Sequence, residues 1–288
     1  MSTPPILVQT NQGTRVDPET MHRRPQRNHG FSQMTRGKWR HLVVAVLTSA
    51  RGRFVLKVAH SPAMIKALIN EAHILTALQE QVPFVAQPLA DTQVNGEHAF
   101  LFTYLNGEPL HKAIQHAGTR ERHQLVVQFA RTLQRVHSWT PDLPYPADWL
   151  TEKLTWLSAN ILARSPETPI TDTNSRFDGT NARQLLAELQ AQRSRIRNDI
   201  VFGHYDYCLP NVLVQGLQVA GIIDWSGGGY IDRRFDLATA LFSMRLTETL
   251  QEPGYQSTFL QAYGYPEPPD SLYFFEALHA LTCAFWHY

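Results

Sequence analysis

The sequence predicts an α+β protein with two lobes, a small β-rich lobe that contains one long helix and a larger, mainly helical lobe. Between residues 39 and 104, short apolar runs alternate with turn signals, whereas beyond Leu105 apolar residues recur at the spacing of helices. We therefore expect an amino-terminal lobe at residues 1–103 and a carboxyl-terminal lobe at residues 104–288. Residues 1–28 are rich in Pro, Arg, Gln and Asn and are predicted to form an irregular leader.

In the small lobe, residues 41–58 predict an antiparallel hairpin, because two apolar runs flank the turn Ala50-Arg51-Gly52. Ser61 then supplies a helix N-cap, and Pro62 suits the first helical position. The helix that begins there is predicted to continue to about Glu80. Two further short strands, joined by the turn Asn95-Gly96, are expected at residues 86–89 and 98–104.

The large lobe begins with a helix predicted at residues 119–138, in which Leu125, Phe129, Leu133 and Val136 are spaced by three and four positions. Residues 164–181 are dense in Ser, Thr, Pro, Asp and Gly and predict a mobile connection. Further helices are expected at residues 148–163 and 182–197, strands at 200–202, 212–214 and 219–223, and helices from there to the end of the chain.

The composition indicates a folded protein of a reducing compartment, since 43% of the 288 residues are hydrophobic, enough for a core in each lobe. Cys208 and Cys283 cannot form a disulfide framework and lack the spacing of a zinc site. The amino terminus has no secretory pattern, and no apolar run reaches about eighteen residues. We therefore expect a cytoplasmic monomer or homodimer with no nucleic-acid or membrane partner.

The charge is unevenly distributed, although its net value is only +1. Residues 1–105 carry 11 basic and 6 acidic side chains, whereas residues 199–288 carry 3 basic and 10 acidic ones. This division fits a phosphate-binding front half and a back half that attracts cations. Solvated surface charge is the simpler alternative.

One stretch carries the strongest chemical signal. Asn211 follows Asp206 by five positions, Asp224 follows Asn211 by thirteen, and short apolar runs flank all three residues. Phosphoryl transfer requires such a set: a carboxylate that orients and deprotonates a hydroxyl group, and oxygen ligands for Mg²⁺ on the phosphates. The pattern His-x-Asp with Asn five positions later is that of kinase catalytic loops. Turn residues and a strand end would explain each residue alone, but not all three in this order.

A second signal lies in the helix expected after Pro62. Glu71 falls within its apolar stripe, which is formed by Met64, Leu68, Leu75 and Leu78. A carboxylate buried there without a partner would be costly, so we expect a cation beside it, and Lys57 is the nearest candidate in sequence. Such a pair steadies the nucleotide phosphates in kinases. The alternative is a Glu71 that reaches solvent and a Lys57 on an exposed strand face.

These residues resemble the aminoglycoside phosphotransferase and choline kinase superfamily, whose signature reads His-Gly-Asp, then Ile-Asp-Trp, then Asp-Leu-Ala. The corresponding residues here are 204–206, 223–225 and 236–238. Cys-Leu-Pro-Asn at residues 208–211 and Asp-Arg at 232–233 are similar to segments of the 3′- and 3″-phosphotransferases of the aminoglycoside branch. Where the signature has glycine this chain has Tyr205, which we expect to narrow the space beside the following aspartate.

The resemblance implies a protein-kinase-like fold and a role for each matched residue of the loop. It makes Asp206 the catalytic base, and it makes Asn211 and Asp224 the Mg²⁺ ligands. His204 and Asp236 become structural supports of the loop.

The resemblance also implies a nucleotide site in the small lobe. Lys57 would contact the α- and β-phosphates, with Glu71 as its partner. We place the loop that covers the phosphates before the first strand pair, with Gly30 and Ser32 as its expected contacts. We place the adenine-binding hinge at the end of the lobe, with Thr103 and Leu105 as its expected contacts.

The implied reaction is the Mg²⁺-dependent transfer of the γ-phosphoryl group of ATP, or of GTP as the alternative donor, to a hydroxyl group of an aminoglycoside-like antibiotic. Two alternatives remain: a kinase of a small metabolite such as choline, homoserine or a methylthio sugar, and a nucleotide-binding pseudoenzyme scaffold. The acidic carboxyl-terminal part suits a polyhydroxylated, cationic acceptor. Its candidate contacts are Asp232, Glu248, Glu267, Asp270 and Glu276.

Overall fold

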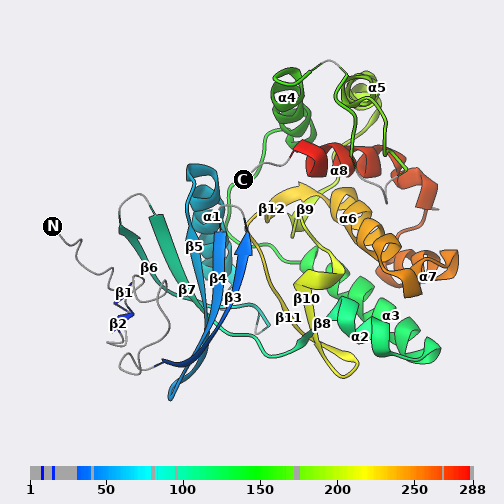
Figure 1. Ribbon diagram of the computed structural model, residues 1–288. Coiled ribbons are helices and arrows are strands. Elements are labelled where there is room, and N and C mark those ends of the chain that lie inside the picture. Colours follow the sequence, from blue (N-terminus) through cyan, green and yellow to red (C-terminus); the bar gives the residue numbers. More distant parts are fainter. Residues whose placement is uncertain are drawn as a thin grey trace. The chain divides into compact units, whose positions relative to one another are not determined.

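Two groups of secondary-structure elements follow one another along the chain in this computed structural model (Figure 1). By their internal contacts, the chain divides into Met1–Leu105 and Asn106–His287, two residues after the expected boundary. The structure describes residues 8–9, 15–16, 31–39, 42–78, 82, 84–94, 97–165, 167–171, 176–267 and 269–285.

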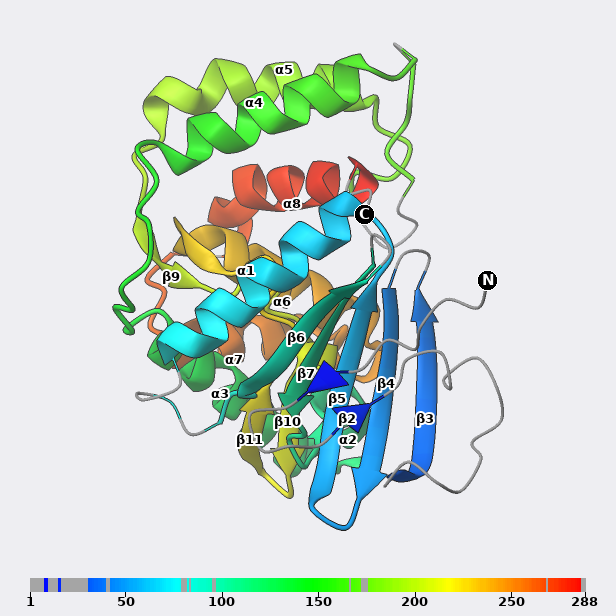
Figure 2. The same cartoon turned by 90° about the vertical axis from the view of Figure 1, so that its left-hand side faces the viewer.

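The amino-terminal unit is built on a five-stranded antiparallel sheet with the strand order β3-β4-β5-β7-β6. Alternate residues of β4, namely Val43, Ala45 and Leu47, are buried, because successive side chains of a strand point to opposite faces. Figure 2 shows helix α1 lying across one face of this sheet. The elements are β1 (Val8–Gln9), β2 (Arg15–Val16), β3 (Phe31–Trp39), β4 (Leu42–Ser49), β5 (Gly52–Ala59), α1 (Pro62–Leu78), β6 (Pro88–Val94) and β7 (Glu97–Thr103).

Helix α1 begins as the sequence predicts. The backbone nitrogen of Met64 donates to the hydroxyl oxygen of Ser61 at 3.3 Å, so Ser61 acts as the N-cap. The whole predicted apolar stripe is buried, including Glu71. The helix ends at Leu78, and residues 79–81 lie outside the described residues.

Two strands differ from the prediction. β3 occupies residues that we assigned to a loop, and β6 begins at Pro88 and continues to Val94, beyond the range expected for it. Both are edge strands, where polar residues are tolerated because one row of backbone groups has no neighbouring strand. Their sequences therefore lack a clear apolar alternation. The predicted turn Asn95-Gly96 lies outside the described residues.

The carboxyl-terminal unit combines helices with two small antiparallel sheets, of order β11-β10-β8 and β12-β9. Its helices are α2 (Leu110–His116), α3 (Thr119–Val136), α4 (Trp149–Leu162), α5 (Ala182–Gln192), α6 (Arg233–Leu246), α7 (Pro253–Tyr263) and α8 (Tyr273–Phe285). Its strands are β8 (Glu108–Pro109), β9 (Ile200–Gly203), β10 (Val212–Gln215), β11 (Gln218–Ile222) and β12 (Gly229–Asp232). The three helices and three strands predicted with bounds in this unit are present within about five residues, and helices α6, α7 and α8 occupy the part predicted to be helical at the end of the chain. Strands β8 and β12 and helix α2 were not predicted.

The connection between α4 and α5 is more ordered than its composition predicts. Pro169 forms a β-bridge with Asn181, and the backbone nitrogen of Ile170 donates to the oxygen of Thr180 at 2.9 Å. Ile170 and Phe177 are buried in the core of the unit. Ile170 and Phe177 therefore anchor the described part of a segment whose composition predicts a mobile connection.

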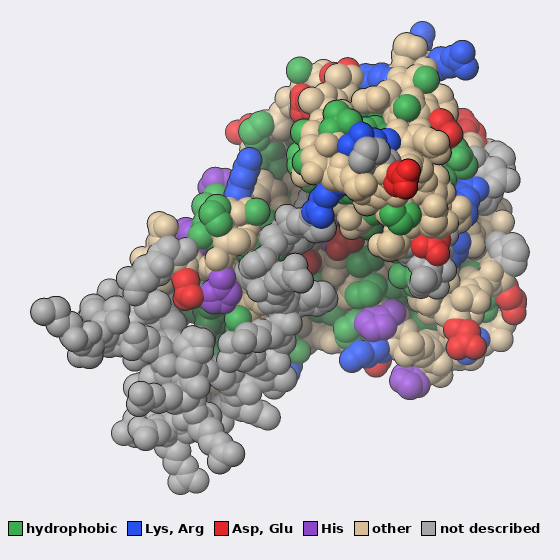
Figure 3. All heavy atoms as spheres, turned by 45° about the horizontal axis from the view of Figure 1, so that its top comes forward, with side chains coloured by type: hydrophobic (Ala, Val, Ile, Leu, Met, Phe, Trp, Pro, Cys, Tyr) green, Lys and Arg blue, Asp and Glu red, His purple; other side chains and the backbone are tan. Residues whose placement is uncertain are grey.

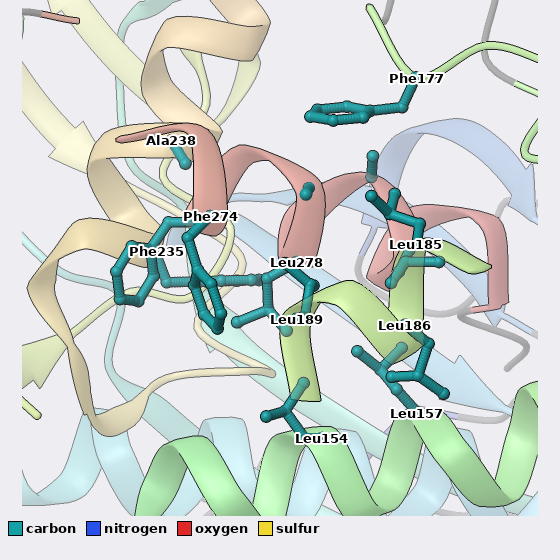
Figure 4. Packing of buried hydrophobic residues seen from close by; sticks show 14 of the residues in the cluster. Leu154, Leu157, Phe177, Leu185, Leu186, Leu189, Phe235, Ala238, Phe274 and Leu278 are labelled. Atoms are coloured by element: carbon teal, nitrogen blue, oxygen red, sulfur yellow. The ribbon is translucent and has the colours of Figure 1, made fainter. Parts of the chain in front are cut away.

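One hydrophobic core of this unit is formed mainly by α4, α5, α6 and α8, whose apolar side chains meet in Figure 4. Leu154 and Leu157 of α4 face Leu186 and Leu189 of α5, and Leu278 of α8 packs in the same cluster. Among the helices of the described residues, none has the length and apolar character needed to cross a bilayer.

We predict that this core is a major source of stability. Replacing the fully buried Leu278 by Ala should lower the free energy of unfolding by about 2–5 kcal/mol, because it removes apolar contacts and leaves a cavity. The matched control is Leu246→Ala, at a leucine that is 46% exposed, with an expected change of about 0.5 kcal/mol or less. Urea unfolding followed by far-UV circular dichroism measures both. Equal losses in the two variants would contradict this assignment of the core.

Candidate active site

Asp206 lies in the loop that follows strand β9. The strand ends at Gly203, and the chain then passes through His204 and Tyr205 to Asp206. The side-chain amide of Asn211 closes this loop, because its Nδ2 donates to Oδ2 of Asp206 at 2.9 Å and to the backbone oxygen of Asp206 at 3.0 Å. Asn211, the candidate metal ligand, therefore orients Asp206, the candidate base five positions earlier in the chain.

Asp224 is brought beside this loop by the pairing of β10 with β11. Val212 pairs with Ile222, and the backbone nitrogen of Ile223 donates to the oxygen of Asn211 at 2.9 Å. Asp224 comes next, with a φ of 65°, a left-handed conformation that aspartate tolerates better than most residues. Asn211 and Asp224 thus stand at the open end of one antiparallel pair, next to the loop of Asp206, the candidate base.

A buried histidine connects the two segments. Nε2 of His204 lies 3.0 Å from the backbone oxygen of Ile223, and since a carbonyl can only accept, Nε2 carries the proton. Burial is the main cause that lowers the pKa of His204, which favours the neutral imidazole. The same residue's backbone nitrogen donates to Oδ2 of Asp236 at 2.7 Å.

The fully buried carboxylate of Asp236 accepts a second hydrogen bond. Nε2 of His137 lies 3.1 Å from Oδ2 of Asp236, and Nδ1 of His137 lies 2.7 Å from the hydroxyl of Tyr263. Gly203 gives the carboxylate its room, because a Cβ there would come within 2.8 Å of Oδ2. The positions of His204 and Asp236 are compatible with the supporting roles expected of them. Their functional importance stays a prediction.

Two carboxylates face the same small region of this site. Desolvation by neighbouring atoms is the first cause, and the negative charge of Asp224 the second, that raise the pKa of Asp206. Because the residue is exposed to solvent, water moderates both effects. The hydrogen bond from Asn211 acts in the opposite direction. Asp206 and Asp224 therefore repel each other, and a cation placed between them would relieve the repulsion.

The donor set fits Mg²⁺. Carboxylate and amide oxygens are the hard ligands that this ion prefers, and it commonly keeps waters and phosphate oxygens in the rest of its coordination shell. Since the amide nitrogen of Asn211 bonds to Asp206, its Oδ1 points away from that bond, while Asp224 presents a carboxylate. Asn211 and Asp224 would hold the ion together with the phosphates of a nucleotide.

The amino-terminal unit contains the ion pair predicted from the sequence. Nζ of Lys57 lies 2.8 and 2.7 Å from the two carboxylate oxygens of Glu71. Their side chains are only 13% and 4% exposed, so the pair is largely desolvated. Strand β5 and helix α1 position the two partners. The contact of Lys57 with nucleotide phosphates stays a prediction.

The expected phosphate-covering loop does not lie near Lys57. Lys57 is opposite Val44 in the sheet, and Val44 is opposite Gly37. Ser32 lies five positions from Gly37 on β3, a distance of about 17 Å along the strand. The phosphate contact of Ser32 stays a prediction, and Gly30 lies outside the described residues.

The two hinge candidates stand at the end of the same unit. Thr103 closes β7, where its backbone nitrogen donates to the oxygen of Gln87 at 2.9 Å and its hydroxyl oxygen accepts from the Gln87 nitrogen at 2.8 Å. Leu105 is the last residue of the unit. Their contact with a nucleotide stays a prediction.

The acidic acceptor candidates separate into two groups. Asp232 is fully buried, where it accepts from the backbone of Asp199 and pairs with Arg234 at 2.7 Å. Glu276 is 5% exposed and is held by Arg176 and, at 2.8 Å, by Arg245. Both carboxylates are enclosed and paired with arginines, which argues against direct contact with an acceptor, and their assigned contact stays a prediction. Glu248 and Glu267 are exposed, and the side chain of Asp270 lies outside the described ones.

Sequence reasoning passed over a buried lysine beside the loop. Lys153 is 7% exposed and donates to the hydroxyl of Tyr205. It lies on the apolar stripe of α4 between the buried Trp149 and Leu157, at four-residue spacing. That spacing is the signal that identified Glu71 in α1, so the same argument would have identified Lys153.

Comparison with known proteins gives a family and a fold. Residues 34–275 match the family described as the phosphotransferase enzyme family. An aminoglycoside 3′-phosphotransferase of Niallia circulans is 32% identical over 93 residues, and a streptomycin 3″-kinase of Streptomyces griseus is 35% identical over 103 residues. These alignments cover 32% and 34% of this chain, and 34% and 38% of the relatives, so the match spans about a third of each relative's length.

Solved structures resemble this chain over most of its length. The aminoglycoside phosphotransferase APH(3″)-Id from Streptomyces rimosus has a TM-score of 0.68 at 24% identity, over 86% of this chain and 92% of that one. The same enzyme in complex with ADP and streptomycin has a TM-score of 0.65 at 25% identity, over 83% and 90% of the two chains. These neighbours confirm the predicted α+β, protein-kinase-like fold with two lobes.

We predict that Lys57 and Glu71 depend on each other for stability. Lys57→Met alone should lower the free energy of unfolding by about 3–5 kcal/mol, because it leaves the carboxylate of Glu71 buried without its cation. The double variant Lys57→Met/Glu71→Leu should recover most of this loss, since no uncompensated charge remains. Urea unfolding of the four proteins of the cycle measures the coupling. Losses that simply add would show that the pair contributes little.

Proposed function

Because this chain belongs to the phosphotransferase enzyme family, we propose that it transfers the γ-phosphoryl group of ATP to a hydroxyl group of a small molecule. The observation that carries the proposal is the convergence of Asp206, Asn211 and Asp224 on one loop and one strand pair. Two carboxylates and an amide oxygen are what such a reaction needs, because its transition state is stabilised mainly by positioning and electrostatics.

In this reaction the residues have distinct tasks. The carboxylate of Asp206 accepts a hydrogen bond from the acceptor hydroxyl and takes its proton as the oxygen attacks the γ-phosphorus and ADP leaves. The amide nitrogen of Asn211 fixes the direction of that carboxylate through its 2.9 Å bond. Asn211 Oδ1 and the Asp224 carboxylate would hold Mg²⁺, which would neutralise charge on the phosphates. Lys57, steadied by Glu71, contacts the α- and β-phosphates.

The acceptor that we propose is an aminoglycoside-like antibiotic, and the chain would then act in antibiotic resistance in the cytoplasm. The support comes from the relatives, which are named as kinases of such compounds, and from the neighbour that binds ADP and streptomycin. An ADP-release assay with aminoglycosides, choline, homoserine and a methylthio sugar as acceptors, and with ATP or GTP as donor, tests this choice. Turnover of choline alone would overturn it.

We predict that Asp206→Asn abolishes turnover and spares nucleotide binding. The substitution removes the base but keeps the size of the side chain, so kcat should fall by about 10²–10⁴-fold. The dissociation constant for ATP with Mg²⁺ should change by only a few-fold, because the base acts on the acceptor. ADP release and isothermal titration calorimetry measure the two quantities. Asp142→Asn, at an exposed aspartate, is the matched control, and parental turnover in Asp206→Asn would refute the assignment.

Asp224→Asn should act on the metal instead. Asparagine tolerates the left-handed backbone of this position, so the fold should persist while one negative charge is lost. We expect ATP to bind at least about tenfold more weakly in the presence of Mg²⁺, since a charged ligand is replaced by a neutral one. In EDTA the variant and the parent should bind ATP alike. Calorimetry in both conditions checks this, and an equal weakening in EDTA would indicate a role other than metal binding.

A further inference from the structure

The carboxylate of Asp224, one of the two candidate Mg²⁺ ligands, is bonded by a hydroxyl group of its own loop. The Oγ of Ser226 lies 3.1 Å from Oδ1 of Asp224. An ionised carboxylate can only accept, so the hydroxyl group donates this hydrogen bond. Because the bond reaches Oδ1, it makes the two oxygens of the carboxylate unequal as ligands for a cation.

The residue between these two partners is fixed by the core. Trp225 is fully buried, and its indole Nε1 donates to the backbone oxygen of Ile222 at 3.1 Å. The backbone nitrogen of Gly228 donates to the oxygen of Trp225 at 3.0 Å and closes the turn that contains Ser226. The anchored tryptophan therefore holds Asp224 and Ser226 in place on its two sides.

The residue that follows Ser226 is also fixed by packing. Gly227 lies against the side chain of Tyr205, because a Cβ at position 227 would come within 2.7 Å of that ring. Tyr205 has a φ of 73°, and its ring centroid lies 4.9 Å from that of Phe235. With packed residues on both sides, the hydroxyl group of Ser226 loses little freedom when it donates to Asp224, so the fold of the loop itself favours this contact.

A hydrogen bond to one carboxylate oxygen affects two common divalent cations differently. Mg²⁺ requires near-octahedral geometry at about 2.0–2.1 Å, whereas Ca²⁺ takes about six to eight oxygen ligands in flexible geometry and often uses both oxygens of a carboxylate. To bind an ion through both oxygens, the carboxylate of Asp224 must turn both of them toward it. The bond from Ser226 opposes this rotation, since its hydrogen competes with the ion for Oδ1.

We propose that Ser226 is a positioning residue that sets the metal preference of the candidate active site. It keeps Asp224 a ligand through one oxygen and so favours Mg²⁺ over Ca²⁺. Ser226 acts through Asp224 and needs no contact of its own with the ion. Removal of a group that bonds to a metal ligand commonly changes metal affinity by about 10–100-fold. The inference rests on the proposed function, because that function requires Asp224 to hold the ion on the nucleotide phosphates.

The test separates the hydroxyl group from the other properties of this side chain. Ser226→Ala removes the hydroxyl group, whereas Ser226→Thr keeps it. Ser257→Ala, at an exposed serine of α7, is the matched control. Thermal unfolding of each variant without nucleotide shows that it is folded.

The measured quantity is the Kd of a non-hydrolysable ATP analogue, determined by isothermal titration calorimetry in Mg²⁺, in Ca²⁺ and in EDTA. The readout is the ratio of the Kd in Ca²⁺ to the Kd in Mg²⁺, which does not depend on turnover. On the face seen in Figure 3, acidic side chains lie scattered among basic and apolar ones. Such carboxylates are the same in every variant, so a change of the ratio on substitution of Ser226 reports on the site of Asp224.

We expect Ser226→Ala to lower this ratio by about tenfold, mainly because the analogue binds more weakly in Mg²⁺. The parent, Ser226→Thr and Ser257→Ala should share one ratio. In EDTA all four proteins should bind the analogue alike, since the hydroxyl group acts only through the metal ligand.

Two results overturn the inference and leave the proposed function standing. One is an unchanged ratio in Ser226→Ala, or a fall of equal size in Ser226→Thr. The other is a weakening of Ser226→Ala that is as large in EDTA as in Mg²⁺, which would give the hydroxyl group a purely structural role. If the parent binds the analogue no more tightly with either metal than in EDTA, the proposed function itself fails, and the inference fails with it.

Discussion

The geometry of the candidate active site depends on one buried carboxylate, that of Asp236. It accepts the backbone N–H of His204, at the start of the catalytic loop, and the imidazole N–H of His137, which comes from α3. His204 in turn donates to the backbone oxygen before Asp224. A single charge at the start of α6 therefore fixes two segments of the site, and the absence of a Cβ at Gly203 allows the approach. Both hydrogen bonds reach Oδ2 from groups that are themselves held in place, whereas the buried Oδ1 has no hydrogen-bond partner among the described residues.

The other buried carboxylates of the described residues are paired with cationic side chains. This pairing distinguishes them from the carboxylate of the candidate base. Glu71 is paired with Lys57, Asp232 with Arg234, and Glu276 with two arginines. Asp206 instead receives a neutral amide and lies near a second negative charge. A carboxylate that the fold leaves electrostatically strained in this manner is suited to bind a cation or to accept a proton.

The sequence indicated which residues come together at the candidate site more clearly than it indicated which residues form the edge strands of the sheet. Asp206, Asn211 and Asp224 could be identified because their spacing along the chain is set by a short loop and a hairpin, which are local structures. The pair of Lys57 with Glu71 was predictable because a charge in an apolar stripe requires a partner. Contacts such as His137 with Asp236 join distant segments and leave no local pattern. Strand β3 was missed because an edge strand does not need alternating apolar residues, and Ser32 therefore lies on a strand instead of in the expected loop.

At position 205 the backbone conformation favours glycine, whereas the protein has a tyrosine whose side chain makes several contacts. Glycine would adopt its left-handed backbone without strain, so natural selection for thermostability alone would tend to remove the aromatic side chain. The same replacement would also remove the ring that packs on Phe235 and the hydroxyl that accepts from the buried Lys153. The strained backbone at this position is therefore balanced by contacts that only a large polar aromatic side chain supplies.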